Sequence, residues 1–129
     1  MNRRNIGTIC TLIGLTFAGT AGAAPLNRDD FRAEKERIET QAKADRKACD
    51  SFSGNAKDIC EAEAKGKEKV ARAELEAQYK PSDKARRNLG EARAEAAYEV
   101  AKERCDDRAG NQKDLCLEEA KAAQKRAKA

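Results

Sequence analysis

Four cysteines in two matching segments are the residues of this sequence with the clearest potential for chemistry. Residues 49–60 read CDSFSGNAKDIC and residues 105–116 read CDDRAGNQKDLC, so each segment begins and ends with a cysteine. Both copies contain a Gly-Asn pair midway and a Lys-Asp pair before the second cysteine. The spacing is C-x10-C rather than the C-x-x-C of redox motifs, and no neighbouring pattern predicts a reactive thiolate. The pattern therefore favours structural disulfides.

Metal binding and catalysis have less support. Cysteine ligands of zinc usually come in pairs two to four residues apart, which is not the spacing here. The chain contains no histidine, so the commonest general base and any Ser-His or Cys-His nucleophile system are missing. Neighbouring carboxylates such as Glu61/Glu63 and Glu118/Glu119 have no aromatic pocket around them and are interpreted as solvated helix faces. We expect no catalytic residue, no cofactor and no metal site.

The first Gly-Asn pair predicts a hairpin that brings two cysteines together. Glycine adopts the left-handed conformation freely, so Gly54 is expected to end a helix. Asn55 is expected to cap the next helix, with Asp58 at its third position, where a carboxylate favours the positive helix end. Cys49 and Cys60 each lie five residues from this turn. They would therefore lie at the same height on two antiparallel helices.

The second copy has the same symmetry. Gly110 and Asn111 would form the turn, and Asp114 would occupy the position equivalent to the first carboxylate. Cys105 and Cys116 would then face one another across the second hairpin.

A rival pairing is open at this point. On unbroken helices, cysteines separated by about three turns would share a face, and two such helices could pair as Cys49–Cys116 and Cys60–Cys105. Four cysteines allow three connectivities, and the sequence alone does not choose between them. The Gly-Asn pair at both midpoints favours pairing within each motif, because it breaks a helix there.

Residues 1–23 have the features of a secretory signal peptide. Arg3 and Arg4 supply a basic start, and residues 6–17 form an apolar stretch that is too short to span a bilayer. The A-x-A sequence at 21–23 would be the cleavage site, and the fifth cysteine would leave with the signal. The four remaining cysteines are an even number, as expected in an oxidising compartment. We predict a periplasmic or secreted protein with no transmembrane segment after signal cleavage.

Charge limits the classes of partner. The chain has 27 Lys and Arg residues and 23 Asp and Glu residues, and two arginines would leave with the signal. Such balance is untypical of a nucleic-acid binder, which gathers positive charge on one face. The basic C-terminal tail of Lys121, Lys125, Arg126 and Lys128 lacks the apolar residues of an inserting helix. We expect an envelope protein of unknown identity or an anionic envelope surface as partner, and self-association is left open.

The segments that must position the cysteines are rich in Ala, Glu, Lys and Arg, which are strong helix formers. Asn27 is expected to cap the first helix, and Pro81 to stop the second helix just before it. No segment shows the alternating pattern of a β-strand. The predicted helices cover residues 28–52, 56–79, 82–108 and 111–129.

The expected fold class is all-α, with two disulfide-stapled antiparallel helical hairpins and Ala-rich, coiled-coil-like packing. Residues 24–80 would form the first hairpin repeat, and residues 81–129 the second. We expect the four helices to form a compact up-down bundle. The alternative is an end-to-end rod with a hinge at Pro81.

The predicted inward faces carry few large apolar side chains, so the staples and close alanine packing must stabilise the fold. The inward residues are expected to be Phe31, Ile38, Ala42, Cys49 and Phe52 in the first helix; Ile59, Cys60, Ala62, Ala64, Gly66, Val70, Ala71, Ala73, Leu75 and Ala77 in the second; Leu89, Ala92, Ala96, Ala97, Val100, Ala101 and Cys105 in the third; and Leu115, Cys116 and Ala120 in the fourth.

The motif C-D-x3-G-N-x-K-D-[IL]-C-x2-E-A-K follows a signal peptide and lies on Ala/Lys/Glu-rich helices. In this it resembles a group of small exported proteins of Gram-negative bacteria, some of which are labelled as similar to the helical Tol envelope protein. The resemblance covers most of the chain after the signal. It implies an exported, disulfide-bearing helical protein and nothing catalytic.

The sequence thus predicts a non-enzymatic periplasmic protein that acts as a scaffold or adaptor of the cell envelope. One alternative is a holdase-like chaperone, which would need an apolar face open to its clients. Another is a thiol-redox or metal-binding protein, which would need free thiols.

Overall fold

The computed structural model describes residues 25–129, and the predicted signal peptide lies outside them. The described chain is all-α, as predicted, and its regular elements are four α-helices and one 3-10 turn. No β-strand occurs in this part of the chain. The elements are α1 Arg28–Ala48, the 3-10 turn η1 Cys49–Ser51, α2 Gly54–Tyr79, α3 Asp83–Cys105 and α4 Asn111–Lys128. Within residues 25–129, no helix combines the length and the hydropathy needed to cross a membrane.

The start of α1 and the break at Pro81 follow the sequence signals. The Asn27 side chain accepts hydrogen bonds from the backbone N–H groups of Asp29 and Asp30 at 2.9 and 2.8 Å, so the predicted cap is confirmed. Helix α2 ends at Tyr79, because the residue before a proline disfavours helical geometry. Ser82 then caps α3 by accepting a hydrogen bond from a backbone N–H.

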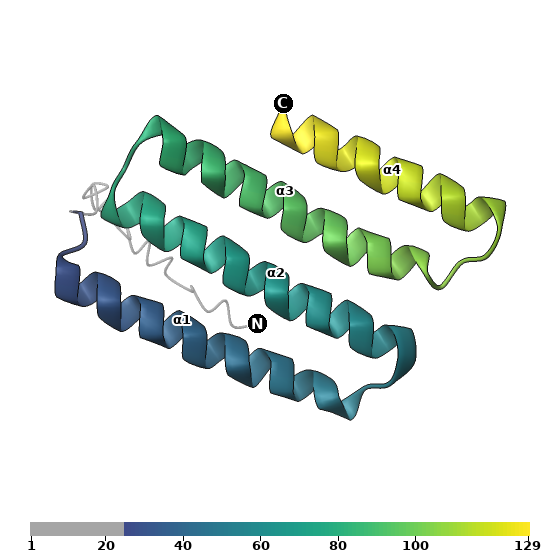
Figure 1. Cartoon of the computed structure of the whole chain (residues 1–129), viewed down its shortest axis with the longest axis horizontal. Coiled ribbons are helices and arrows are strands. Elements are labelled where there is room, and N and C mark those ends of the chain that lie inside the picture. The colour runs from purple at the N-terminus through teal and green to yellow at the C-terminus, as the bar shows by residue number, and fades with distance from the viewer. Residues whose placement is uncertain (1–24) are drawn as a thin grey trace, which may run out of the picture.

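The four helices lie side by side in a single layer, in the order α1, α2, α3 and α4, and each runs antiparallel to its neighbours (Figure 1). Within the described chain, each helix packs only on the helices next to it in sequence, and α2 with α3 forms the largest interface. Both predicted arrangements of the hairpins are therefore wrong. A compact bundle would place α1 against α4, and a rod would separate α2 from α3.

The layer arises because α2 has small residues on two opposite edges. Cys60 is bonded to Cys49 of η1, directly after α1, and Ala64 lies one turn further along that edge of α2. Gly66 contacts Ala96 of α3, and Ala62 lies one turn before it. Residues two apart on a helix point about 200° apart, so Ala64 and Gly66 face opposite neighbours. A compact bundle would need two adjacent faces instead.

Most buried side chains are small, as predicted. The buried apolar residues are Ile38, Ala42, Cys49, Ala62, Ala64, Leu75, Ala92, Ala94, Cys105 and Ala120. A methyl group added to Gly66 would lie 3.0 Å from the Cβ of Ala96, so α2 and α3 approach closely at this point. Ala94 was not among the predicted inward residues. It is buried because it lies on the edge of α3 that also carries Cys105 toward α4.

Three residues expected to face inward are exposed. Phe52 is 52% exposed because the chain has already left α1 and runs extended there. Leu115 is 62% exposed because, among the described helices, α4 has a neighbour on one side only. Ala97 is exposed on one face of the layer. Phe31 is half-buried and stacks on Tyr79, with ring centroids 4.3 Å apart.

Candidate functional site

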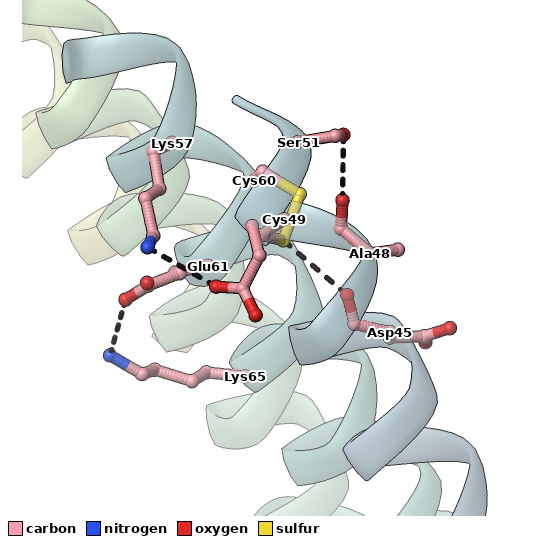
Figure 2. The surroundings of a disulfide bond; sticks show 9 residues. Asp45, Ala48, Cys49, Ser51, Lys57, Cys60, Glu61 and Lys65 are labelled. Carbon is pink, nitrogen blue, oxygen red and sulfur yellow. Dashed lines mark hydrogen bonds and ion pairs between the residues drawn. A yellow bond between two sulfur atoms is a disulfide. The ribbon is translucent and has the colours of Figure 1, made fainter. Parts of the chain in front are cut away.

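The two disulfides are the chemical feature that the sequence singled out, and each forms within its own motif. Cys49 is bonded to Cys60 and Cys105 to Cys116, with Cα–Cα distances of 5.6 and 5.7 Å. The first cysteine of each pair is fully buried, and the second is half-buried (Figure 2 shows the first pair). The pairing within each motif is confirmed, and the rival pairing between motifs is wrong. Both stapled turns lie at the same end of the layer (Figure 1).

The glycines act at the start of the second helix and not at the end of the first. Helix α1 ends at Ala48, and the 3-10 turn and two extended residues follow before Gly54 begins α2. Gly54 and Gly110 have φ of +57° and +53°, a region that glycine enters without strain. Ser51 donates its hydroxyl to the Ala48 carbonyl at 3.0 Å, which satisfies a carbonyl at the end of α1 (Figure 2).

Asn55 does not cap α2, because the helix begins one residue earlier and Ser53 occupies the cap position. Its side-chain amide instead donates to the backbone carbonyl of Glu103 at 2.9 Å and to Asp107 Oδ1 at 2.7 Å. Asn55 therefore connects the first stapled turn to the second. Asn111, the equivalent residue of the second motif, is exposed at the start of α4.

The two acidic motif residues that were expected at helix starts differ in position. Asp114 lies in the first turn of α4. Asp58 lies beyond the first turn of α2, since that helix begins at Gly54. The carboxylate of Asp58 therefore interacts less favourably with the helix dipole than predicted.

An ion pair that occurs in both turns was missed by the sequence analysis. Lys57 pairs with Asp50 at 3.2 Å, and Lys113 pairs with Asp106 at 2.8 Å. These four residues hold the same places in the two motifs, so the repeat itself was the signal that could have revealed the pair. The hydrogen bond with Asp106 raises the pKa of Lys113 above its ordinary value.

A network of charges joins α1 to α2. Glu68 accepts hydrogen bonds from Arg72 on its own helix at 2.8 Å and from Arg46 of α1 at 2.5 Å. Arg72 also reaches Glu39 of α1 at 3.3 Å. The hydrogen bonds from Arg72 and Arg46, in that order, hold the pKa of Glu68 below its ordinary value. Glu68 therefore stays ionised and binds two helices together.

One face of the α2–α3 pair carries a pocket of about 300 Å³, which we call the acidic pocket. Glu95 of α3 lies in it and pairs with Lys69 of α2 and with Lys128 of α4. Hydrogen bonds from Lys69 and then Lys128 lower the pKa of Glu95. The pocket is lined by Asp58, Glu61, Ala62, Lys65, Gly66, Lys69, Glu95, Ala96, Glu99 and Glu103.

The opposite face of the same helix pair carries a larger hollow of about 740 Å³, which we call the apolar groove. Val70 and Val100 line it, and Ala97 is exposed in it. The groove is lined by Glu63, Gly66, Lys67, Val70, Ala71, Glu74, Ala96, Ala97, Val100, Ala101, Arg104 and Cys116. Several of these residues were expected in a buried core, whereas in the structure they line an open groove.

The carboxyl groups of Glu34, Glu68 and Glu95 have lowered pKa values and therefore favour their charged forms. Among the described residues, each carboxyl group whose pKa shifts moves downward, because a basic side chain donates a hydrogen bond to it. A catalytic acid needs the opposite shift, which burial away from cations produces. No three His, Cys, Asp or Glu side chains of residues 25–129 come together in a way that could hold a metal ion. The exposed charges and the apolar groove are the features of these faces that can form ion pairs and apolar contacts with another surface.

Comparisons with protein-family models, with curated proteins and with solved structures find no match to this chain.

Proposed function

We propose that this chain is a non-enzymatic, exported helical protein that acts as a scaffold or adaptor in the cell envelope. The observation that carries the proposal is the single layer of helices, which leaves two broad faces open to other molecules (Figure 1). Stapled turns fix one end of both hairpins, and ion pairs such as Arg46–Glu68 and Lys69–Glu95 tie neighbouring helices together. Such a layer can present charged side chains in a fixed arrangement.

The disulfides support the proposed compartment. Both pairs are compatible with an oxidising environment outside the cytosol. The basic and apolar start of the chain supports export through a cleaved signal peptide. The mass of the protein purified from a periplasmic extract tests this proposed export. Cleavage after residue 23 would leave a protein that begins at Ala24. Retention of the first 23 residues would contradict it.

Photo-crosslinking in intact cells tests the adaptor role. A photo-reactive amino acid would replace Asn88, which lies on the acidic-pocket side of the layer, or Gln78, which lies on the other side. A third variant would carry the photo-reactive amino acid at Ala122 on α4 as the control. We expect the same envelope protein to be captured repeatedly from one face and not from Ala122. Irradiation that yields no envelope protein from either face would refute the adaptor role.

A holdase-like chaperone is the second candidate, and the apolar groove favours it. A client with exposed apolar segments could contact Val70 and Val100 there. Light scattering from an unfolding envelope protein tests this function. We expect an equimolar amount of the chain to suppress aggregation and Ala97→Glu to abolish the effect, because the change puts a charge in the groove. Equal scattering with and without the chain would refute it.

A further inference from the structure

The apolar groove lies between α2 and α3, and no described helix of the chain covers it. Helices α1 and α4 pack on the outer edges of the α2–α3 pair and extend the layer sideways (Figure 1). Val70 and Val100 are therefore only half-buried, and Ala97 is exposed. An apolar strip of this kind along two antiparallel helices is half of the core of a four-helix bundle.

Ion pairs across the groove indicate what could cover it. Arg104 of α3 pairs with Glu63 of α2 at 2.9 Å, and Arg93 of α3 pairs with Glu74 of α2 at 2.7 Å. In each pair the acidic residue lies on α2 and the basic residue on α3, and these two residues lie at the same height along the groove. The four side chains are between 42% and 62% exposed, so they can also reach an outside partner.

We propose that a second copy of this chain covers the apolar groove, related by a twofold axis that runs along the groove. Rotation about that axis places α2 of one copy over α3 of its partner. Glu63 then lies over the Arg104 position of the other chain, and Glu74 over the Arg93 position. Each cross-groove ion pair becomes a square of alternating charges, which is the complementarity expected of a self-associating surface.

The helix directions fit the same arrangement. Helices α2 and α3 are antiparallel, so stacking α2 on the partner's α3 makes every adjacent pair in the new bundle antiparallel. Antiparallel neighbours have opposed helix dipoles, which is favourable. The bundle expected from the sequence would thus form between two chains, with their α2 and α3 helices as its core. Lys67 also lines the groove, and its long side chain can extend along the wall and keep the ammonium in water.

The available area is sufficient for a stable dimer. A helix of the length of α3 is about 35 Å long, and two packed helices are about 20 Å wide. Face-to-face stacking would therefore bury roughly 700 Å² on each chain, which approaches the roughly 800 Å² per partner of standard protein interfaces. The inference does not depend on the proposed adaptor function, because the outer faces remain open in such a dimer.

Sedimentation equilibrium of the disulfide-bonded chain tests the proposal. We expect a dimer at tens of micromolar protein, and we expect Ala97→Glu to weaken dimerisation by at least about tenfold, because a charge enters the apolar contact. Ala97 is exposed in the single chain, so its replacement should not prevent folding. The matched control is Ala122→Glu on α4, which should leave the dimer intact. A monomer at all concentrations, or a dimer that Ala97→Glu leaves unchanged, would overturn the proposal.

Charge reversal tests the direction of the axis. Arg104→Glu would place like charges over each other in the proposed dimer and should weaken dimerisation, and the double change with Glu63→Arg should restore it. Circular dichroism of each variant would verify that the helices are retained. A dimer that weakens with Ala97→Glu but is indifferent to Arg104→Glu would overturn the twofold axis along the groove.

Discussion

Asn55 donates its side-chain amide to the backbone carbonyl of Glu103, across 48 residues of sequence and at a distance of 2.9 Å. The same amide reaches Asp107 Oδ1 at 2.7 Å. The hydrogen bonds of this one asparagine thereby connect the turn of the first hairpin to the end of α3, where the second turn begins. The two disulfides lie in separate hairpins, and this contact joins their turns directly.

Replacement of Asn55 should destabilise the protein more than replacement of its counterpart in the second motif. We expect Asn55→Ala to lower the free energy of unfolding by about 1–2 kcal/mol, since two hydrogen bonds are lost, one of them to a carboxylate. The matched variant Asn111→Ala removes an exposed side chain at the start of α4 and should change stability by less than about 0.5 kcal/mol. Urea unfolding of both variants measures the difference. Equal losses would show that the contact between the turns contributes nothing.

The disulfides should contribute much of the stability of a protein with so few large buried side chains. Each closes a short loop, and loss of one should cost about 2–3 kcal/mol by enlarging the unfolded ensemble. We expect dithiothreitol to lower the melting temperature sharply, as followed by circular dichroism at 222 nm. A Cys49→Ala/Cys60→Ala variant should show part of this loss without reductant. An unchanged melt after reduction would refute the structural role.

Two glycines in helix interiors should respond in opposite ways to alanine. A methyl group at Gly90 meets no atom within 4 Å, so Gly90→Ala should stabilise α3 by about 0.5–1 kcal/mol through helix propensity. A methyl group at Gly66 would lie 3.0 Å from the Cβ of Ala96 and would push α2 and α3 apart. We therefore expect Gly66→Ala to be less stable than Gly90→Ala by at least about 1 kcal/mol in urea unfolding. Equal stabilisation by both would contradict the close approach.

Stability should fall in acid, and Glu68 should account for part of the loss. Its pKa is lower in the folded chain than in the unfolded chain, so the unfolded state binds more protons as the solution is acidified. The stabilisation is therefore present above the ordinary carboxyl pKa and is lost as the pH falls through the lowered value. We expect Glu68→Gln to reduce the difference in unfolding free energy between pH 7 and pH 3. Glu91→Gln, which removes an exposed carboxylate on α3, serves as the control. An equal pH dependence in both variants would contradict the prediction.

Local features of the fold could be predicted from the sequence. Asn27 caps α1 by binding backbone N–H groups two and three residues further along the chain. Pro81 disfavours helical geometry in the residue before it and so ends α2. The pairing of Cys49 with Cys60 followed from a break at the midpoint of the motif. Each of these depends on residues that are close together in sequence.

The role of Asn55 and the shape of the molecule could not be predicted in this way. Asn55 lies inside α2 and bonds to a carbonyl of the other hairpin, a partner 48 residues away that the local cap pattern does not indicate. The single layer depends on small residues at both edges of α2, which a period of 3.6 residues does not distinguish from one broad apolar face. The exposure of Leu115 in turn follows from the layer, since among the described helices α4 packs on α3 alone.

The matched positions of the two motifs also show how the outer edge of α4 differs from the edge of α2 that packs on α3. Ala62, Gly66 and Val70 of α2 lie beside α3, and the residues at the same places in the second repeat are Glu118, Ala122 and Arg126. Two of these three residues are charged, at positions where the packing of a further hairpin against α4 would need small side chains. The charged residues on this edge of α4 therefore disfavour edgewise growth of the layer into filaments.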